Sequence, residues 1–190
     1  MLITIAVSGS GCRTDVLSHV HGISRLHAAG IGDALIERHL VVEDGGAYRC
    51  LHPVIAHLVR DGLTSSRRQE VHRALALALE RVVTPEDLPQ AAGALARHAE
   101  RGLERDMAYR YARIASEAAV ARYAYAEALS WLDLAAASAR SAEQVATVDG
   151  LTADVLERAG WSEAPTRAAQ PVTREIASDD LDLRVKPTTR

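Results

Sequence analysis

The amino-acid sequence predicts a mainly α-helical fold that carries one short β-hairpin in its first third. Apolar residues make up 48% of the 190 residues, and they are rich in alanine and leucine and include no phenylalanine. Small apolar side chains of this kind are typical of helices that pack closely together. Apolar residues recur at helical spacing along residues 63–160, whereas residues 39–53 hold two β-prone runs separated by glycines.

The first element to place is the loop that follows an apolar run at the N-terminus. Residues 6–17, AVSGSGCRTDVL, have the glycine-rich layout of a phosphate-binding loop. Cys12 stands where such a loop needs its last glycine, Arg13 stands where it needs lysine, and the leading glycine is also missing. We therefore expect no ATP binding here, but a turn between two short helices, with Thr14 or Asp15 capping the second.

Two helices are predicted before the hairpin, at residues 14–21 and 24–38. The second begins at Ser24, a residue type that favours the N-cap position. Gly30 and Gly32 each weaken this helix by about 1 kcal/mol relative to alanine. Its apolar side is expected to hold Leu26, Ala29, Ala34, Leu35 and Ile36.

A β-hairpin and a further helix complete the N-terminal region. Residues 40–43 and 47–51 are short β-prone runs, and the Asp-Gly-Gly sequence at 44–46 tolerates the positive φ of a tight turn. Pro53 suits the first turn of the helix that follows. Three helices, a hairpin and a helix form a winged-helix arrangement, which we assign to residues 1–62.

The charges of this region do not suit direct recognition of DNA. Arg25 and Arg38 on the helix before the hairpin are balanced by Asp33 and Glu37, and the hairpin tip is acidic. The whole chain has a net charge of −3, with acidic and basic residues interspersed. Because nucleic-acid surfaces are basic, we expect no direct binding of nucleic acid.

A helical segment follows at residues 63–160. Its first helix opens in the stretch 64–66, where Ser66 and Gln69 fit a capping box. The sequence Thr-Pro-Glu-Asp at 84–87 ends this helix and starts a second one, for which Gly102 is the expected C-cap. The first helix has the apolar stripe Val71, Leu75, Leu79 and Val82 and the solvated residues Arg67, Arg68 and Arg73, and the second has the stripe Leu88, Ala92, Leu95 and Ala99.

An internal repeat relates residues 106–119 to residues 126–139. At an offset of 20 residues, Ala108, Tyr111 and Ala115 match Ala128, Trp131 and Ala135. Small residues on both sides of a ring let helices approach closely, and we expect an α-solenoid that resembles degenerate tetratricopeptide repeats. One more helix is predicted at 141–159, with Val145, Val148, Leu151, Val155 and Leu156 apolar, and the aromatic residues expected in the core are Tyr109, Tyr111, Tyr123, Tyr125 and Trp131.

The remaining residues, 161–190, combine prolines, threonines and mixed charges without a sustained period, which predicts a flexible tail. No apolar run reaches the roughly 20 residues that span a membrane, so no membrane association is expected. Cys12 and Cys50 lack metal-type spacing and are expected to be reduced thiols, which favours the cytoplasm.

Three motifs together carry a family resemblance. They are a wing with the pattern LVVEDGG-Y-R, an HP pair at the junction of strand and helix, and the helical pattern RR-x-x-x-H-x-x-x-A-x-x-L that begins at Arg67. In this order they resemble the winged-helix region of STAND-class ATPases, which include bacterial regulators of LuxR type and AAA type. The resemblance covers about residues 2–140 and implies a nucleotide-binding domain, which this chain lacks, before the winged helix and helical repeats after it.

The resemblance also implies one site residue. In the related NB-ARC ATPases, a histidine of the MHD motif at this junction contacts the β-phosphate of bound ADP. His52 occupies that place here, with Pro53 instead of the acidic residue. A hydrogen bond from an imidazole to phosphate contributes about 1.5–3 kcal/mol and would couple nucleotide state to domain position. The alternative for His52 is a ring satisfied by backbone groups at a helix start.

No catalytic constellation is visible, because His52 and His57 lack a neighbouring acidic partner and the serines and cysteines lack a base. We therefore expect a non-enzymatic regulatory and protein-interaction module without a cofactor of its own, with ATP or ADP bound by a nucleotide-binding domain on another chain. Its apolar face towards that domain is expected to stay exposed. The alternative is a small stand-alone regulator that binds nucleotide through residues 8–14 or DNA through the winged helix.

Overall fold

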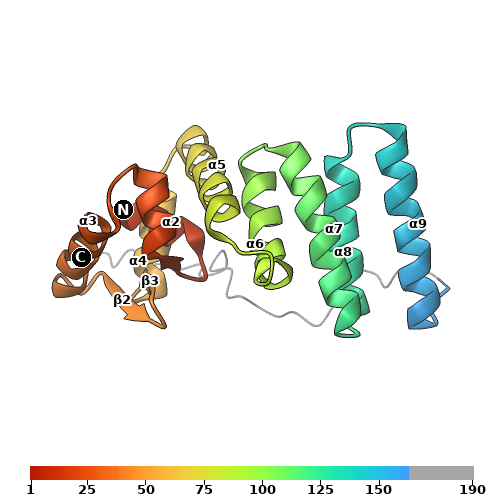
Figure 1. Ribbon diagram of the computed structural model, residues 1–190. Helices are drawn as coiled ribbons and strands as arrows, with labels where there is room; N and C mark the ends of the chain where they lie inside the picture. The colour runs from red at the N-terminus through yellow and green to blue at the C-terminus, as the bar shows by residue number, and fades with distance from the viewer. Residues whose placement is uncertain (163–190) are drawn as a thin grey trace, which may run out of the picture.

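The computed structural model describes residues 1–162, which form nine α-helices and one antiparallel sheet of three short strands. The prediction of a mainly helical chain with a β-hairpin is therefore confirmed. The sheet lies with the first four helices at one end of the molecule, and the other five helices follow in a row (Figure 1). The predicted tail lies outside the described residues, apart from its first two positions.

The N-terminus forms two helices joined by a turn, as predicted. Helix α1 (Leu2–Ser8) is followed by the two-residue strand β1 (Cys12–Arg13) and by α2 (Thr14–His21). Strand β1 was not expected. The predicted cap was wrong, because Arg13 is the N-cap residue and Thr14 and Asp15 already lie in the first turn of α2. The Asp15 side chain accepts a hydrogen bond from the neighbouring Val16 N–H at 2.8 Å instead.

Helix α3 (Arg25–Glu37) begins as predicted, because the Ser24 side chain accepts a hydrogen bond from the backbone N–H of His27. Its predicted apolar side is correct only in part: Leu35 and Ile36 pack against the core as expected. Ala28 and Gly32 are the buried residues, whereas Leu26 is 84% exposed. The helix therefore presents its smallest residues to the interior.

Tyr48 is the reason for this orientation. Its ring is buried against α3, and a Cβ atom added to Gly32 would lie 2.6 Å from the ring carbon Cε1 and from the hydroxyl oxygen. Real Cβ contacts are longer, so the ring fits only because residue 32 has no side chain. The glycine that costs α3 helical propensity is what lets the hairpin pack against it.

The predicted hairpin consists of β2 (Val41–Asp44) and β3 (Ala47–Cys50). Gly45 and Gly46 connect the strands with φ values of 56° and 78°, as a two-residue turn with positive φ requires. The other edge of β3 pairs with β1, so that the strand order is β1-β3-β2. Helix α4 (Pro53–Asp61) follows with proline in its first turn, as expected.

Helices α5 (Ser65–Val82) and α6 (Leu88–Arg101) are separated by the predicted break. The predicted capping box at Ser66 was wrong, because Thr64 is the N-cap residue and its hydroxyl accepts the Arg67 N–H at 3.3 Å. Gly102 is the C-cap of α6, as predicted. It is buried, and a Cβ there would lie 2.7 Å from the backbone of Arg73.

Three further antiparallel helices complete the row: α7 (Arg105–Ala121), α8 (Tyr125–Ser138) and α9 (Ala142–Ala159). Each helix from α5 to α9 packs on the next one. The turns before α7 and α8 repeat each other at an offset of 20 residues, because Leu103 and Tyr123 have φ values of 60° and 61°. In the residues that follow, Glu104 and Ala124 donate their N–H groups to Ala99 and Ala119.

The predicted aromatic core is correct except at its exposed end. Tyr109, Tyr111 and Trp131 are buried and Tyr125 is partly buried against the same cluster. Tyr123 is 80% exposed because it occupies the turn with positive φ. The matched alanines of the repeat are all buried: Ala108, Ala115, Ala128 and Ala135.

Two clusters of buried apolar residues form the core, and α5 belongs to both. Leu75 and Ala78 pack with the sheet and the first helices, whereas Ala76 packs with α6 to α8. Within the described residues, no helix is both long and apolar enough to cross a membrane.

Candidate functional site

His52, the site residue implied by the resemblance, is the N-cap residue of α4. It is exposed, and its Nδ1 accepts a hydrogen bond from the Val54 N–H at 3.4 Å. Its Nε2 makes no hydrogen bond to a described residue. The ring thus caps α4 through Nδ1, which is the backbone contact at a helix start that the alternative for His52 predicted.

Exposed apolar side chains surround His52. Leu51, Val54 and Leu58 are 47%, 52% and 65% exposed, although α4 is strongly amphipathic. Helical spacing places Val54 and Leu58 on one face of α4, and Leu51 lies between the end of β3 and the start of α4. We call these three residues the α4 apolar face.

His57 has an acidic partner, Asp61, which the sequence analysis did not predict. Its Nε2 lies 3.1 Å from a carboxylate oxygen of Asp61, four residues later on the same helix. The expectation of no acidic neighbour was therefore wrong for His57, because the i, i+4 spacing on α4 brings the two side chains together.

A buried histidine pair joins α5 to α6. The Nδ1 atoms of His72 and His98 are 2.8 Å apart, and both rings are buried. One Nδ1 must carry the proton that the other accepts, so the accepting ring is neutral with its own proton on Nε2. The sequence reading missed this pair, although each histidine lies three residues from a buried leucine on the apolar side of its helix.

Burial and nearby cations keep the pair neutral. Burial lowers the pKa of His72 to about 4, and the guanidinium groups of Arg101 and Arg68 act in the same direction. Burial lowers the pKa of His98 to about 3, followed by the effects of His72, Arg101 and Arg97. Both rings are therefore uncharged at neutral pH.

A cavity of about 800 Å³ opens beside this pair, between α5, α6, α4 and the turn after α1. We call it the basic cavity. Each of the two longer helices contributes positions i, i+3, i+4 and i+7, namely Ser65, Arg68, Gln69 and His72 from α5 and Ala94, Arg97, His98 and Arg101 from α6. Arg60 is a fourth arginine in the wall. Among residues 1–162, Asp61 supplies the one carboxylate that lines the cavity, and it pairs with His57.

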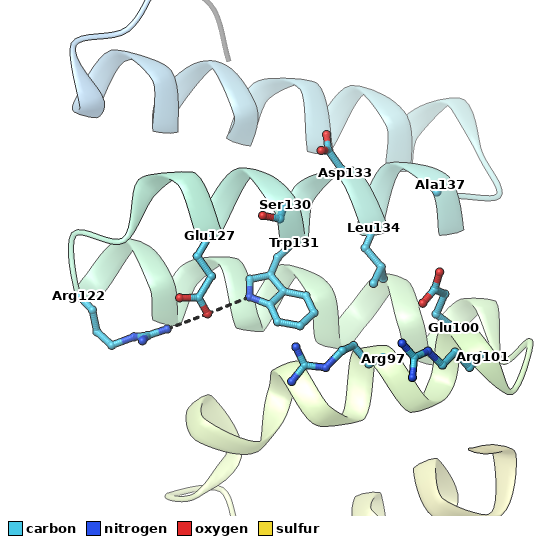
Figure 2. Close-up of a pocket in the computed structure, with 10 residues that line it drawn as sticks. All are labelled: Arg97, Glu100, Arg101, Arg122, Glu127, Ser130, Trp131, Asp133, Leu134 and Ala137. Carbon is cyan, nitrogen blue, oxygen red and sulfur yellow. Dashed lines mark hydrogen bonds and ion pairs between the residues drawn. The ribbon is translucent and has the colours of Figure 1, made fainter. Parts of the chain in front are cut away.

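A second cavity, of about 730 Å³, lies between α6 and α8. We call it the α6–α8 groove. Figure 2 shows Trp131 projecting from α8 towards α6, with Arg97 facing its ring; the guanidinium carbon lies 5.1 Å from the ring centroid. Glu127 accepts hydrogen bonds from Trp131 Nε1 at 3.3 Å and from Arg122 at 3.2 Å, which fixes the indole (Figure 2). Gly93 makes room, since a Cβ there would lie 2.8 Å from the indole carbon Cζ2.

The two cavities share one wall. Arg97 and Arg101 line both, because they lie on α6 between the basic cavity and the α6–α8 groove. Charges of both signs line the groove, whereas the basic cavity is predominantly cationic.

The thiols of this chain are poor nucleophiles. Burial raises the pKa of the Cys12 thiol to about 12, with a smaller contribution from Asp15, and burial also raises the pKa of Cys50. A thiolate is the reactive form, so neither residue is activated. Within residues 1–162, no group of three or more histidine, cysteine or acidic side chains is placed to hold a metal ion.

No family model, curated protein or solved structure matches the chain.

Proposed function

We propose that the chain is a non-enzymatic regulatory and protein-interaction module whose α6–α8 groove holds a peptide segment of a partner protein. It would correspond to the winged-helix and helical-repeat part of a STAND-type regulator of LuxR type. Three features support this proposal: the order of three helices, hairpin and helix, the row of antiparallel helices after it, and the repeated turn at Leu103 and Tyr123. Stacked helices of this kind present surfaces that bind other proteins.

The observation that carries the proposal is the fixed position of the Trp131 indole beneath Arg97 in the α6–α8 groove. Its ring is fixed by the Glu127 hydrogen bond and by Gly93, and it is 7% exposed, so it forms the floor of the groove beneath the exposed Arg97 guanidinium. Arginine is one of the residues that most often dominate binding energy at protein interfaces, and the buried indole holds this one in place. The carboxylates of Glu100 and Asp133 beside them would orient a peptide by charge.

The α4 apolar face supports a second contact, with a nucleotide-binding domain on another chain. The face adjoins His52, whose Nε2 makes no hydrogen bond within the described residues. An exposed apolar patch of this kind is typical of an interaction site. In this proposal ATP or ADP belongs to the partner domain, and His52 donates to its phosphate. The two free thiols, Cys12 and Cys50, are in keeping with the reducing cytoplasm.

Selection from a library of random displayed peptides tests the groove. We expect peptides that share a motif, and substitution Trp131→Ala should weaken their binding by about 30-fold or more. Arg97→Glu tests the same surface without removing a core side chain. Arg158→Glu, an exposed position on α9, is the matched charge control and should leave binding unchanged. Enriched peptides that bind the Trp131 and Arg97 variants as well as the wild type would refute the proposal.

A further inference from the structure

We propose that the basic cavity is a binding site for a small phosphorylated anion, held by Arg68, Arg97 and Arg101. This inference goes beyond peptide binding in the α6–α8 groove and does not depend on it. The ligand class is a phosphate, a diphosphate or an ester of either, with at least two negative charges.

The first argument is the charge that this cavity concentrates. Arg73, Arg110 and Arg140 each pair with a carboxylate from another part of the chain. Arg68, Arg97 and Arg101, by contrast, form no ion pair with any carboxylate of the described residues. Arg60 also lines the cavity, and its Nη1 donates to the Ala6 carbonyl oxygen at 3.4 Å.

Several positive charges in one concave wall repel one another, which raises the electrostatic energy of the protein without a ligand. The described residues place few negative charges beside them. Asp61 is the one carboxylate in the lining, and it is engaged with His57 at 3.1 Å. A concave surface of one sign focuses its field on a counter-ion. A dianion bound there would relieve the repulsion among the three guanidinium groups.

The second argument is geometric. Arg97 and Arg101 are four residues apart on α6, and they line the cavity together with Arg68 of α5, so two helices bring three cationic side chains to one wall. Arg68 Nη2 also donates to the Arg60 carbonyl oxygen at 3.1 Å, and the Arg97 guanidinium lies over the Trp131 ring. Guanidinium groups bind phosphate oxygens through paired hydrogen bonds, and a phosphate has enough oxygens to engage more than one fork. A single carboxylate has only two oxygens and suits this wall less well.

Neutral donors complete the site. Ser65, in the first turn of α5, lines the cavity, and the N-terminus of this 18-residue helix favours negative charge. In the His72–His98 pair, the ring that accepts through Nδ1 carries its own proton on Nε2. This Nε2–H is not used in the contact between the two histidines, so it is a further hydrogen-bond donor. The volume of about 800 Å³ falls within the range of small-molecule sites.

Calorimetric titration of the full chain with pyrophosphate at low salt tests the inference. We expect binding that weakens as salt rises, and Arg68→Gln and Arg101→Gln should each reduce the affinity about tenfold or more. Arg67→Gln is the matched control, because it removes the same charge from the neighbouring position of α5, outside the cavity. It should change the affinity less than twofold.

Parallel titrations with inorganic phosphate and ADP separate the sources of the phosphoryl group. Tighter binding of ADP than of pyrophosphate would identify a nucleotide as the ligand, and equal binding would identify the phosphates alone. The inference is overturned if none of the three probes binds at millimolar concentration, or if Arg67→Gln weakens binding as much as Arg68→Gln does. Trp131→Ala removes no arginine from the basic cavity, so anion binding that persists in this variant while peptide binding is lost separates the two proposals.

Discussion

Gly32 shows how a single residue reconciles two opposing demands. It lies inside α3, where glycine lowers helical propensity, yet it is buried against the Tyr48 ring. Gly30, on the same helix, has no atom within 4 Å of a Cβ placed on it. The two glycines look alike in the sequence, and the packing of a residue from the hairpin makes them different.

This difference gives a matched pair of substitutions. Gly32→Ala should lower the free energy of unfolding by about 1–3 kcal/mol, because the new methyl group forces the Tyr48 ring out of its place. Gly30→Ala should raise it by up to about 1 kcal/mol through helical propensity alone. Urea denaturation measures both values. Equal effects of the same sign would show that the ring does not pack on residue 32.

The contact between α5 and α6 depends on the protonation of two histidines. Both pKa values are lowered in the folded protein, His72 to about 4 and His98 to about 3, mainly by burial. The unfolded chain takes up protons near the ordinary value of 6.5. Below that pH the unfolded state binds more protons than the folded state, so stability falls as pH is lowered, and above it the contribution is complete.

We therefore expect the free energy of unfolding to fall by on the order of 1–2 kcal/mol for each unit of pH between 6.5 and about 4. The double variant His72→Gln/His98→Gln should flatten this dependence, since two amides can bond to each other without titrating. His27→Gln, at an exposed position on α3, should keep the wild-type slope. Urea denaturation at a series of pH values measures the slopes, and parallel curves for all three proteins would contradict the assignment.

Short sequence motifs were enough to predict most helices and the hairpin. The features that they did not predict depend on contacts between residues far apart in the chain. The Ser24 cap and the hairpin turn could be predicted because each depends on neighbouring residues, and the repeat because similar residues recur at a constant offset. Thr64 and Ser66 are equivalent as caps by residue type, and only the path of the chain into α5 selects Thr64. The partners His72 and His98 are far apart in the chain, so their spacing carries no signal of the contact.

The molecule as a whole is joined through α5, which contributes buried side chains to both apolar cores. The two cores are therefore not separable by cutting the chain between the hairpin region and the helical row. A loss of packing in one core reaches the other through the same helix. This connection predicts that both parts unfold in one transition.

Leu75→Ala tests this coupling. Leu75 is buried in the core that holds the sheet, and its truncation should lower the free energy of unfolding by about 2–5 kcal/mol. Hydrogen exchange of the hairpin and the fluorescence of Trp131, measured in a Trp161→Phe background, should report the same shift. Leu77→Ala, at an exposed position on the same helix, should change stability by no more than about 0.5 kcal/mol. A Trp131 transition that stays in place while the hairpin unfolds earlier would contradict the coupling.

Helix α6 is a partition with a separate compartment on each side, and Arg97 faces both. Its guanidinium covers the indole of Trp131, and an anion bound in the basic cavity as proposed would compete for that same group. Binding of the anion would then alter the surface that the α6–α8 groove offers to a peptide. Thermodynamic reciprocity would then require that a peptide bound in the groove change the affinity for the anion by the same factor, so Arg97 would couple the two cavities in both directions.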